Sequence, residues 1–372
     1  MPDPHERYHR QTLLSGFGKD GQHRLLASTV LIAGCGALGS MLADMLARAG
    51  VGHLIIVDRD FVELTNLQRQ VLFDEQDVEL ALPKAEAARQ KIGRINNQVK
   101  VTAVVDDLNH TNIEQLAFPV RGEPGTSGPV DVIVDGLDNF ETRFLLNDCA
   151  VKHGIPYVYG GAVGTAGMTL AILPHTEGGV SPWERSGHAT PCLRCLFEQP
   201  PPPGMNPTCD TVGVLGPLVA NVASHEATEA MKVLTGNWDA INPTMQHLDL
   251  WENRFHQFDV DNAYKGGHCR CCKQRRFDFL DGDAVSGTTT LCGRNAVQFR
   301  PKATNIAIPF EEIVERLRRH GSVKCNDFML LAHITDQGKP YELSLFPDGR
   351  VIVKGTKKTS VAKSIYAKYV GG

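Results

Sequence analysis

Short apolar runs alternate with helix-period segments through the first half of the chain. Residues 29–33 and 54–57 are aliphatic and β-branched, which predicts two buried strands. Between them, apolar side chains recur at three- and four-residue steps, so a helix is predicted that ends at Gly50 and Gly52. Further strands are predicted at residues 99–105, 130–134, 156–159 and 169–173. This alternation is typical of an α/β fold with a doubly wound, mostly parallel sheet.

The last quarter of the chain has a different pattern. Residues 280–305 are rich in Gly, Thr and Asp, which predicts a linker. After it we predict a helix from residue 310, three strands and a final helix, with the strands at residues 328–334, 341–346 and 351–354. The chain is therefore predicted to have two domains, residues 1–280 and 281–372, of which the second is a small C-terminal α/β appendage. Two Gly/Pro-rich stretches are predicted to be loops, residues 121–129 and 198–208.

Composition excludes several classes of function. The 372 residues include 38 Lys and Arg against 42 Asp and Glu, and this slightly acidic balance argues against a nucleic-acid partner. The most apolar stretch, residues 30–57, is interrupted by Asp44, Arg48 and His53, so no membrane span is expected. The N-terminus is polar and lacks the apolar core of a signal peptide, which predicts a cytoplasmic protein. In that reducing compartment, the 10 cysteines are expected to bind metal or perform chemistry.

A glycine loop separates the first predicted strand from the first helix. Gly34 allows a tight turn, Gly36 lets the backbone approach a phosphate, and Gly39 lets the helix pack close to the strand. Asp58 ends the next strand, 22 residues after Gly36, where a carboxylate can bind ribose hydroxyls. The motif predicts a Rossmann-like nucleotide site. This motif is most often found in NAD-dependent oxidoreductases.

The polar residues that follow Asp58 favour a triphosphate over a dinucleotide. A dense polar segment comes directly after the strand and includes Asp60, Asn66, Arg69 and Gln70. Lys84 stands at a predicted helix start, so two cations are expected near the site. Asp138, followed by Asn139, ends a later strand and can hold Mg²⁺ through oxygen. The chain has no Gly-x4-Gly-Lys-Ser/Thr motif, so an ATP site here is not a P-loop.

Two cysteine pairs have the spacing of zinc knuckles. Four thiolates can close a tetrahedral structural Zn²⁺ site, here Cys192, Cys195, Cys269 and Cys272. Cys271 is an additional thiol, and the spacing leaves open whether Cys271 or Cys272 is the ligand. Cys209 follows the Pro-rich segment on a predicted exposed loop, where a thiol with a lowered pKa can attack an acyl group.

Taken together, these motifs resemble the ThiF/MoeB/HesA family, bacterial relatives of ubiquitin-activating enzymes. The resemblance runs from about residue 7 to about residue 272. The matching motifs occur in family order: Arg7-Tyr-His-Arg10-Gln, Gly34-x-Gly36-x-x-Gly39, Asn66-Leu-Gln-Arg69-Gln70, Pro83-Lys84, Asp135-Gly-Leu-Asp138-Asn139, the two Cys-x-x-Cys pairs and Val214-Leu-Gly216-Pro217. Such enzymes use ATP to adenylate the C-terminal Gly-Gly carboxylate of a ubiquitin-like sulfur-carrier protein, and pyrophosphate leaves.

The resemblance implies a role for each motif. Gly36 and Gly39 would pack against adenosine and the α-phosphate, and Asp58 would bind ribose. Phosphate charge would be neutralised by Asn66, Arg69 and Lys84, while Asp138 would hold Mg²⁺. The resemblance also implies a homodimer, in which Arg10 reaches the ATP of the other subunit. Cys209 matches a cysteine that forms a covalent link to the activated carrier in some members and is dispensable in others.

Several alternatives stay open at this point. An NAD-dependent oxidoreductase would explain the glycine loop and Asp58 but not Arg69, Lys84 or the cysteine pairs. A non-catalytic nucleotide-binding dimeric scaffold would keep the fold without turnover. The appendage lacks the cysteine loop of a rhodanese around Cys325, so the sulfur donor, a cysteine desulfurase or a rhodanese, is expected to be a separate protein. The sequence does not choose among the thiamine, molybdopterin, cysteine and tRNA-thiolation pathways. The terminal Gly371-Gly372 is predicted to be a disordered end, and the role of residues 281–372 stays open.

Overall fold

The structure of the chain, a computed structural model, describes residues 6–119, 128–200, 208–284, 290–291, 296–299, 310–347 and 349–370. A large sheet organises most of these residues. Its eight strands are β1 Thr29–Ala33, β2 His53–Val57, β3 Lys100–Val104, β4 Val132–Asp135, β5 Tyr157–Val163, β6 Ala166–Ile172, β7 Met245–Asp249 and β8 Arg254–Phe258. They lie in the order β3-β2-β1-β4-β5-β6-β7-β8. Neighbouring strands are parallel from β3 to β5 and antiparallel from β5 to β8, which confirms the predicted mostly parallel α/β fold.

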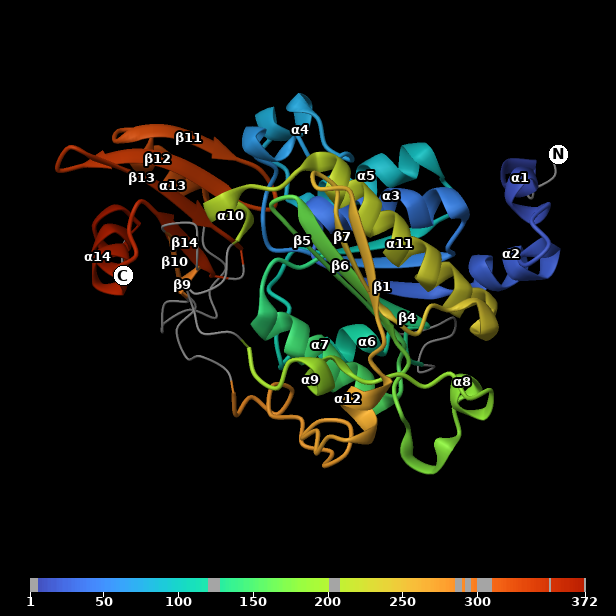
Figure 1. Ribbon diagram of the computed structural model, residues 1–372. Helices are drawn as coiled ribbons and strands as arrows, with labels where there is room; N and C mark the ends of the chain where they lie inside the picture. The colour runs from blue at the N-terminus through green and yellow to red at the C-terminus, as the bar shows by residue number, and fades with distance from the viewer. Residues whose placement is uncertain are drawn as a thin grey trace.

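Helices cover both faces of this sheet (Figure 1). One face carries α2 Gly18–Ala27, α3 Ala37–Ala49, α5 Lys84–Ile95 and α11 Gly216–Thr235. The other face carries α6 Ile113–Ala117 and α7 Phe140–His153. Alternate residues of β1 therefore belong to different apolar cores, with Val30 and Ile32 in one and Leu31 and Ala33 in the other. Burial on both sides explains why the central strands are continuously apolar in sequence.

Several shorter elements complete the first part of the chain. The helices are α1 His9–Thr12, α4 Glu75–Glu79, α8 Pro182–Arg185, α9 Leu193–Leu196, α10 Cys209–Val212 and α12 Asp261–Lys265. The 3-10 helices are Glu6–Tyr8, Leu64–Asn66, Glu177–Gly179 and Trp238–Ala240. No helix among the described residues combines the length and the apolar character that crossing a bilayer requires.

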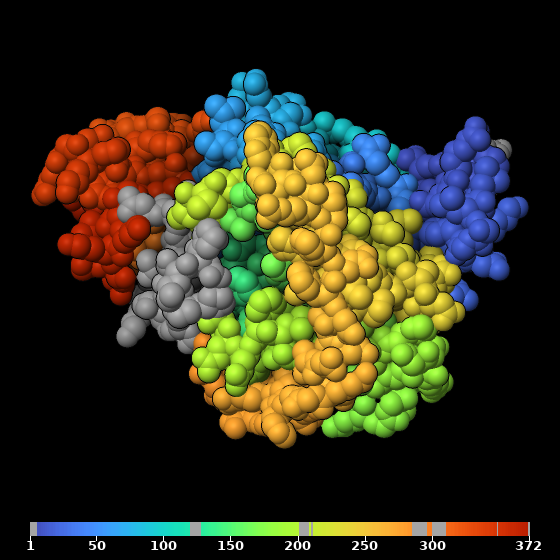
Figure 2. Space-filling model, viewed as in Figure 1, coloured from blue at the N-terminus to red at the C-terminus, as the bar shows by residue number. Residues whose placement is uncertain are grey.

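A second sheet follows, and it is antiparallel throughout. Its six strands are β9 Thr290–Leu291, β10 Ala296–Phe299, β11 Gly321–Cys325, β12 Leu330–Asp336, β13 Lys339–Leu345 and β14 Val351–Lys354. We call it the C-terminal sheet; its order is β11-β12-β13-β14-β10-β9. The helices α13 Phe310–Leu317 and α14 Thr359–Tyr369 pack with it around a separate apolar core. In Figures 1 and 2 this part lies at the opposite end of the molecule from the N-terminal helices.

The prediction of a linker over residues 280–305 was wrong in part. β10 lies inside that stretch and pairs with β14, so that Val297 faces Val353 across the ladder. Four residues are too few to show a period, which is why the pattern missed this strand. The division into domains at residue 280 stays a prediction. The two predicted loops are only partly covered, because residues 120–127 and 201–207 lie outside the described residues.

Candidate active site

Three strands end level with one another at the carboxyl edge of the large sheet. In the ladder, Ala33 of β1 pairs with Val57 of β2 on one side and with Asp135 of β4 on the other. The strand order reverses at the β1–β4 pair: β2 and β3 lie on the β1 side of this pair, and β5 lies on the β4 side. Ligands of open α/β sheets bind in the crevice at such a point. The residues that follow β1, β2 and β4 therefore form the candidate site.

The glycine loop joins β1 to α3 through a tight turn. Gly34 has φ +86°, a left-handed conformation that favours glycine, and its amide donates to the Val57 carbonyl at 2.8 Å. A Cβ on Gly39 would lie 1.9 Å from the Gly34 carbonyl oxygen. Gly136, after β4, is packed in the same way, with its Cβ position 2.4 Å from that oxygen. The backbones of α3, the glycine loop and the segment after β4 are therefore in direct contact. Gly136 is a packing residue that the sequence did not reveal.

Gly36 has a different environment from Gly34 and Gly39. It precedes the first turn of α3, and the nearest atom to its Cβ position is Nε2 of Gln70, 4.0 Å away. Free N–H groups at the start of a helix attract anions. The space beside Gly36 is therefore where a phosphate can approach the backbone most closely.

Asp58 ties the end of β2 to the glycine loop. Its Oδ2 accepts a 2.6 Å hydrogen bond from the Cys35 amide, and its Oδ1 accepts one from the Asp60 amide at 2.7 Å. Burial raises the pKa of the Asp58 carboxyl, and the nearby Lys84 ammonium offsets part of that rise. Each carboxylate oxygen has a second lone pair, so both can still accept a ligand hydroxyl.

Two cations stand beside Asp58, of which Lys84 is buried and Arg59 is partly buried. Lys84 begins α5, its side chain is only 3% exposed, and its Nζ lies 3.1 Å from Oδ2 of Asp60. Arg59 Nη1 donates to Oδ1 of Asp107 at 2.5 Å. Burial lowers the pKa of Arg59, but Asp107, Asp60 and more weakly Asp138 raise it by more, so the guanidinium stays charged. Arg59 and Asp107 are site residues that sequence reasoning missed.

The segment after Asp60 turns back over the loop. The Asn66 side chain is buried and accepts from the Glu63 amide at 3.1 Å, while Gln70 is buried against the loop. Arg69 is partly exposed, and its Nη1 donates to the Thr65 carbonyl at 2.9 Å. The structure thus brings Gln70 next to Gly36, whereas the Arg69 side chain folds back onto its own segment.

The end of β4 supplies a further acidic group. Asp138 is exposed, and Asn139 caps α7 by accepting a 2.9 Å hydrogen bond from the Thr142 amide. The buried Asp135 before them accepts from Arg143 Nε at 3.0 Å and from the Tyr157 hydroxyl at 2.6 Å. These contacts anchor the strand end, and Asp138 after it is a carboxylate exposed to solvent.

Cys209 lies at the same edge, and Arg10 does not. Cys209 begins α10, is partly buried, and its Sγ lies 3.4 Å from the carbonyl oxygen of Ala162 near the end of β5. Arg10 is exposed on α1. Its neighbour Tyr8 packs on Gly50 at the end of α3, the opposite end from Gly36. Within one chain, Arg10 is therefore separated from the glycine loop by the length of α3, roughly 20 Å.

A separate cluster joins the two cysteine pairs. The Sγ atoms of Cys192, Cys195, Cys269 and Cys272 all lie within 4.8 Å of one another. Individual separations are 3.8 Å between Cys192 and Cys195, 3.6 Å between Cys192 and Cys269, and 3.4 Å between Cys195 and Cys272. Zinc–thiolate bonds of about 2.3 Å in a tetrahedron give sulfur separations of about 3.8 Å. The donor set therefore fits a structural zinc ion.

Neighbouring polar side chains hold both cysteine pairs in place. The buried Asn147 accepts from the Leu193 amide at 2.8 Å and donates to Cys271 Sγ at 3.4 Å. Arg194, with only 5% of its side chain exposed, pairs with Asp148 and with Asp278. Cys271 therefore contacts α7 and lies outside the four-sulfur cluster, which favours Cys272 as the ligand.

Comparison with known proteins settles the family. The sequence pattern described as the ThiF family matches residues 8–271, well over half of the chain. The chain belongs to the ThiF family. A "Sulfur carrier protein ThiS adenylyltransferase" of Bacillus subtilis is 39% identical over 366 residues, which cover 98% of this chain and 99% of that protein. A "Sulfur carrier protein adenylyltransferase" of Thermus thermophilus is 37% identical over 284 residues, 76% of this chain and 96% of the relative.

Solved structures agree with this ThiF-family fold. Escherichia coli MccB with MccA-N7isoASN superposes with a TM-score of 0.57 at 21% identity, covering 72% of this chain and 75% of that chain. MccB with ATP gives a TM-score of 0.55 at 22% identity, covering 72% and 74%. At this identity the likeness concerns the fold alone. The match to the Bacillus subtilis relative covers 98% of the chain and therefore includes the C-terminal sheet.

Proposed function

We propose that this ThiF-family chain is an adenylyltransferase that uses ATP to adenylate the C-terminal Gly-Gly carboxylate of a ubiquitin-like sulfur-carrier protein. The observation that carries the proposal is the meeting of the glycine loop with Lys84 and Arg59 at one edge of the sheet. Two relatives that span most of the chain carry names for this activity. A triphosphate carries more negative charge than the pyrophosphate of a dinucleotide, so two cations at this edge support ATP as the substrate.

The proposed nucleotide site uses the groups at this edge. Asp58 binds ribose, Gly34, Gly36 and Gly39 form the wall next to adenosine and the α-phosphate, and Asp60 orients Lys84. Lys84, Asn66 and Arg69 bind the phosphates, for which the Arg69 side chain has to leave the Thr65 carbonyl. Gln70, next to Gly36, and Asn139, next to Asp138 in the sequence, are proposed to border the same space. The exposed Asp138 is suited to hold Mg²⁺, which when bound supplies positive charge to the phosphates.

The reaction requires charge and position rather than a general base. A terminal carboxylate oxygen of the carrier attacks the α-phosphorus of ATP, and a new O–P bond forms. The bond from that phosphorus to the bridging oxygen breaks, and pyrophosphate leaves with the electron pair. The carboxylate is ionised at neutral pH, so no proton has to be removed. Fixed cations that face the developing charge on pyrophosphate lower the barrier.

We further propose that the site is completed in a homodimer. Arg10 lies at the end of α3 that is remote from Gly36, so it cannot reach its own chain's nucleotide. Placed against a second copy, an exposed arginine on α1 can bind the partner's triphosphate. A mixed dimer of R10A and D138A chains should then recover activity that neither homodimer has, because one of its sites is intact.

Cys209 and the neighbouring hairpin supply the proposed carrier side of the site. The turn after β5 is hydrogen-bonded to the start of α11 and to the end of β7. The Leu215 amide donates to the Gly164 carbonyl at 2.9 Å, and the Leu250 amide donates to the Thr165 carbonyl at 3.0 Å. The β7–β8 hairpin (gold in Figure 2) therefore lies beside α10. It exposes Trp251, Phe255 and Phe258, at 71%, 65% and 48%. Phe255 and Phe258 lie three positions apart on β8 and face opposite sides of the hairpin. We therefore propose that the carrier binds at the Trp251 end, because the neighbouring Leu250 bonds the turn after β5 and β5 contacts Cys209, the thiol proposed to receive the activated carrier. The sulfur donor is proposed to be a separate protein. The protein is proposed to be cytoplasmic, because a reducing compartment keeps the zinc ligands as thiolates.

Pyrophosphate–ATP exchange tests the proposal. We expect exchange that requires a ubiquitin-like protein ending in Gly-Gly, and a carrier lacking those two residues is the matched control. D138A and R69A should abolish the exchange. Exchange without a carrier, undiminished exchange in D138A, or tight NADH binding in place of ATP would each contradict the assignment.

A further inference from the structure

The C-terminal sheet packs directly against the strand edge that forms the nucleotide site. Phe61, which follows Asp60, shares an apolar cluster with Ala296, Met329, Leu331, Phe346 and Ile352 of the C-terminal part. Lys354 of β14 pairs with Glu63 and lies 5.0 Å from the centroid of the Phe61 ring. The C-terminal part of the chain therefore covers the segment around Asp60 and shields it partly from solvent.

Arg350 carries a charge from the C-terminal sheet into this contact. It precedes β14, its side chain is only 1% exposed, and its guanidinium carbon lies 4.0 Å from the centroid of the Phe346 ring. Its Nη2 donates to the Val105 carbonyl at 3.1 Å, just beyond the end of β3. Its Nη1 lies 3.8 Å from Oδ2 of Asp107. A charged side chain that is buried so fully is stable only with such partners.

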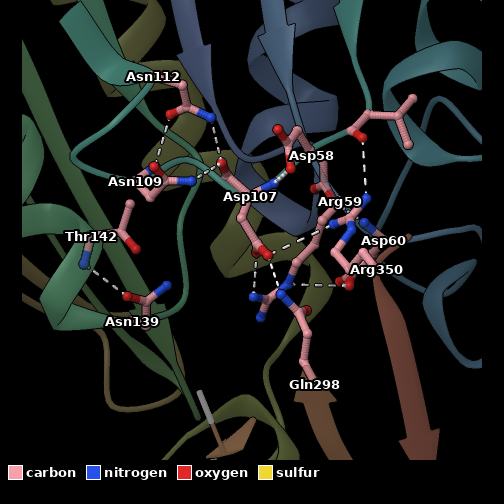
Figure 3. Close-up of polar contacts among 12 residues, drawn as sticks. Asp58, Arg59, Asp60, Asp107, Asn109, Asn112, Asn139, Thr142, Gln298 and Arg350 are labelled. Carbon is pink, nitrogen blue, oxygen red and sulfur yellow. Dashed lines mark hydrogen bonds and ion pairs between the residues drawn. The ribbon is translucent and has the colours of Figure 1, made fainter. Parts of the chain in front are cut away.

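Asp107 is one of the residues through which the two parts of the chain meet (Figure 3). Its carboxylate receives Arg59 at 2.5 Å from the β2 side, and Arg350 and Gln298 from the C-terminal sheet. Asn109 and Asn112 hold its backbone, donating to the Asp107 carbonyl at 3.0 and 2.7 Å. The carboxylate is thus held from three directions and in turn holds Arg59 next to Asp58 and Asp60.

We propose that Arg350 is a positioning residue for the nucleotide site: through Asp107 it orients Arg59, so that the C-terminal sheet completes the ATP-binding edge. This inference rests on the proposed function, since it takes ATP as the ligand. In the sequence, Arg59 lies between Asp58, the proposed ribose ligand, and Asp60, the partner of Lys84. The negative charge of Asp138 also interacts with the Arg59 guanidinium. Its orientation therefore decides how much positive charge faces a phosphate.

The charge balance gives Arg350 a second effect. Asp107 has one negative charge and is shared by two guanidinium groups, so part of the Arg59 charge remains available to a ligand. Without Arg350, Asp107 pairs with Arg59 alone, and the pair is more nearly neutral. Lysine at position 350 would keep the charge but lose the planar fork that spans the Val105 carbonyl and Asp107. Arg350 thus acts on the ligand only through Asp107 and Arg59.

Direct ATP binding to the full-length protein tests this chain of contacts. We expect R350A to raise the calorimetric Kd for Mg-ATP about tenfold and R350K to raise it by about threefold at most. R59A and the double variant R59A/R350A should bind ATP equally weakly, because both changes act on one group. If R350A fails to fold, R350M provides the same test, because methionine removes the charge and keeps an apolar side chain against Phe346.

A matched control separates positioning from simple loss of the interface. Asn326 Nδ2 donates to the Leu80 and Ala81 carbonyls at 3.0 and 3.1 Å, in the same interface but away from Asp107. N326A should lower the melting temperature and leave the Kd unchanged. An unchanged Kd in folded R350A, or an equal rise in N326A, would overturn the inference. Wild-type protein that binds no ATP would instead refute the proposed function, so the two failures are distinguishable.

Discussion

The Cβ position of Gly39 points at the carbonyl oxygen of Gly34, and a methyl group there would come within 1.9 Å of that oxygen. No side chain can move aside to relieve this contact, because both partners are backbone. We therefore expect G39A to lower the free energy of unfolding by about 3 kcal/mol. Urea unfolding at neutral pH measures the loss.

Gly36 provides the contrasting variant in the same loop. Its Cβ position is 4.0 Å from the nearest atom, Nε2 of Gln70, so G36A should fold with almost unchanged stability. ATP binding should nevertheless weaken, because the methyl group occupies the space through which a phosphate approaches the helix N-terminus. Equal stability loss in G36A and G39A would contradict this division of roles.

Lys84 and Lys91 lie on the same helix and allow a paired test of the phosphate site. Lys84 is buried and bonds Asp60 at the site, whereas Lys91 pairs with Asp74 and Asp77 away from it. Removal of a fixed charge that faces the transition state costs roughly 10²–10³ in rate. K84A should lose pyrophosphate exchange by about this factor, and K91A should keep it within about twofold. Similar losses in both would show that the helix, and not the charge, matters.

The sequence predicted the central strands because they are buried on both faces. Each of β1, β2 and β4 is a continuous apolar run, and a short run of this kind next to a glycine loop is typical of a strand in a parallel sheet. The pattern missed β8, which is exposed along its whole length, and the edge strand β11, which is exposed at four of its five residues. Strands without a buried face show no alternation, so hydrophobic periodicity cannot reveal them.

Some residues of the candidate site were likewise predictable from the sequence, and others were not. Asp58 and Asp138 follow strands in sequence, so their meeting at one edge was predictable from topology. The link between Asp107 and Arg350 joins residues 243 positions apart, and no local pattern connects them. Arg143 was missed because its helix shows no clear polar face in sequence, although its guanidinium is buried against Asp135. Long-range ion pairs depend on how the two sheets pack, and that is visible only in three dimensions.

The four-sulfur cluster makes zinc content a direct measurement. Purified protein should contain about one zinc ion per chain, as determined by elemental analysis. C192S removes a thiolate from the cluster and should lose most of the metal. Its melting temperature should also fall, because the ion joins segments that are far apart in the sequence.

Cys271 supplies the control for the zinc site. Its Sγ accepts from Asn147 and lies outside the cluster, so C271S should retain zinc. Serine preserves the hydrogen-bond acceptor and nearly the same volume. Full zinc in C192S, or loss of zinc in C271S, would show that the ligand set is different.

Glu226 predicts a pH dependence of stability. It lies in the middle of α11, is fully buried, and packs onto the backbone of β5 at Gly160. Burial, and to a smaller extent the charge of Asp135, raises the pKa of its carboxyl well above the ordinary value. The folded state therefore holds a proton that the unfolded chain releases above about pH 4.3. Stability from this group is complete below that pH and is lost as the pH rises through the folded pKa.

Glutamine at this position is neutral at every pH and nearly the same shape. The free energy of unfolding of E226Q minus that of the wild type should therefore increase from pH 5.5 to pH 8, by at most about 1.4 kcal/mol per pH unit. E252Q is the control: Glu252 is a surface residue, 3.5 Å from Arg254 and 53% exposed, so its difference should stay flat. Urea unfolding of the three proteins across this range measures both differences. Parallel curves for E226Q and the wild type would mean that Glu226 is ionised in the folded protein, which is the one state that its burial opposes.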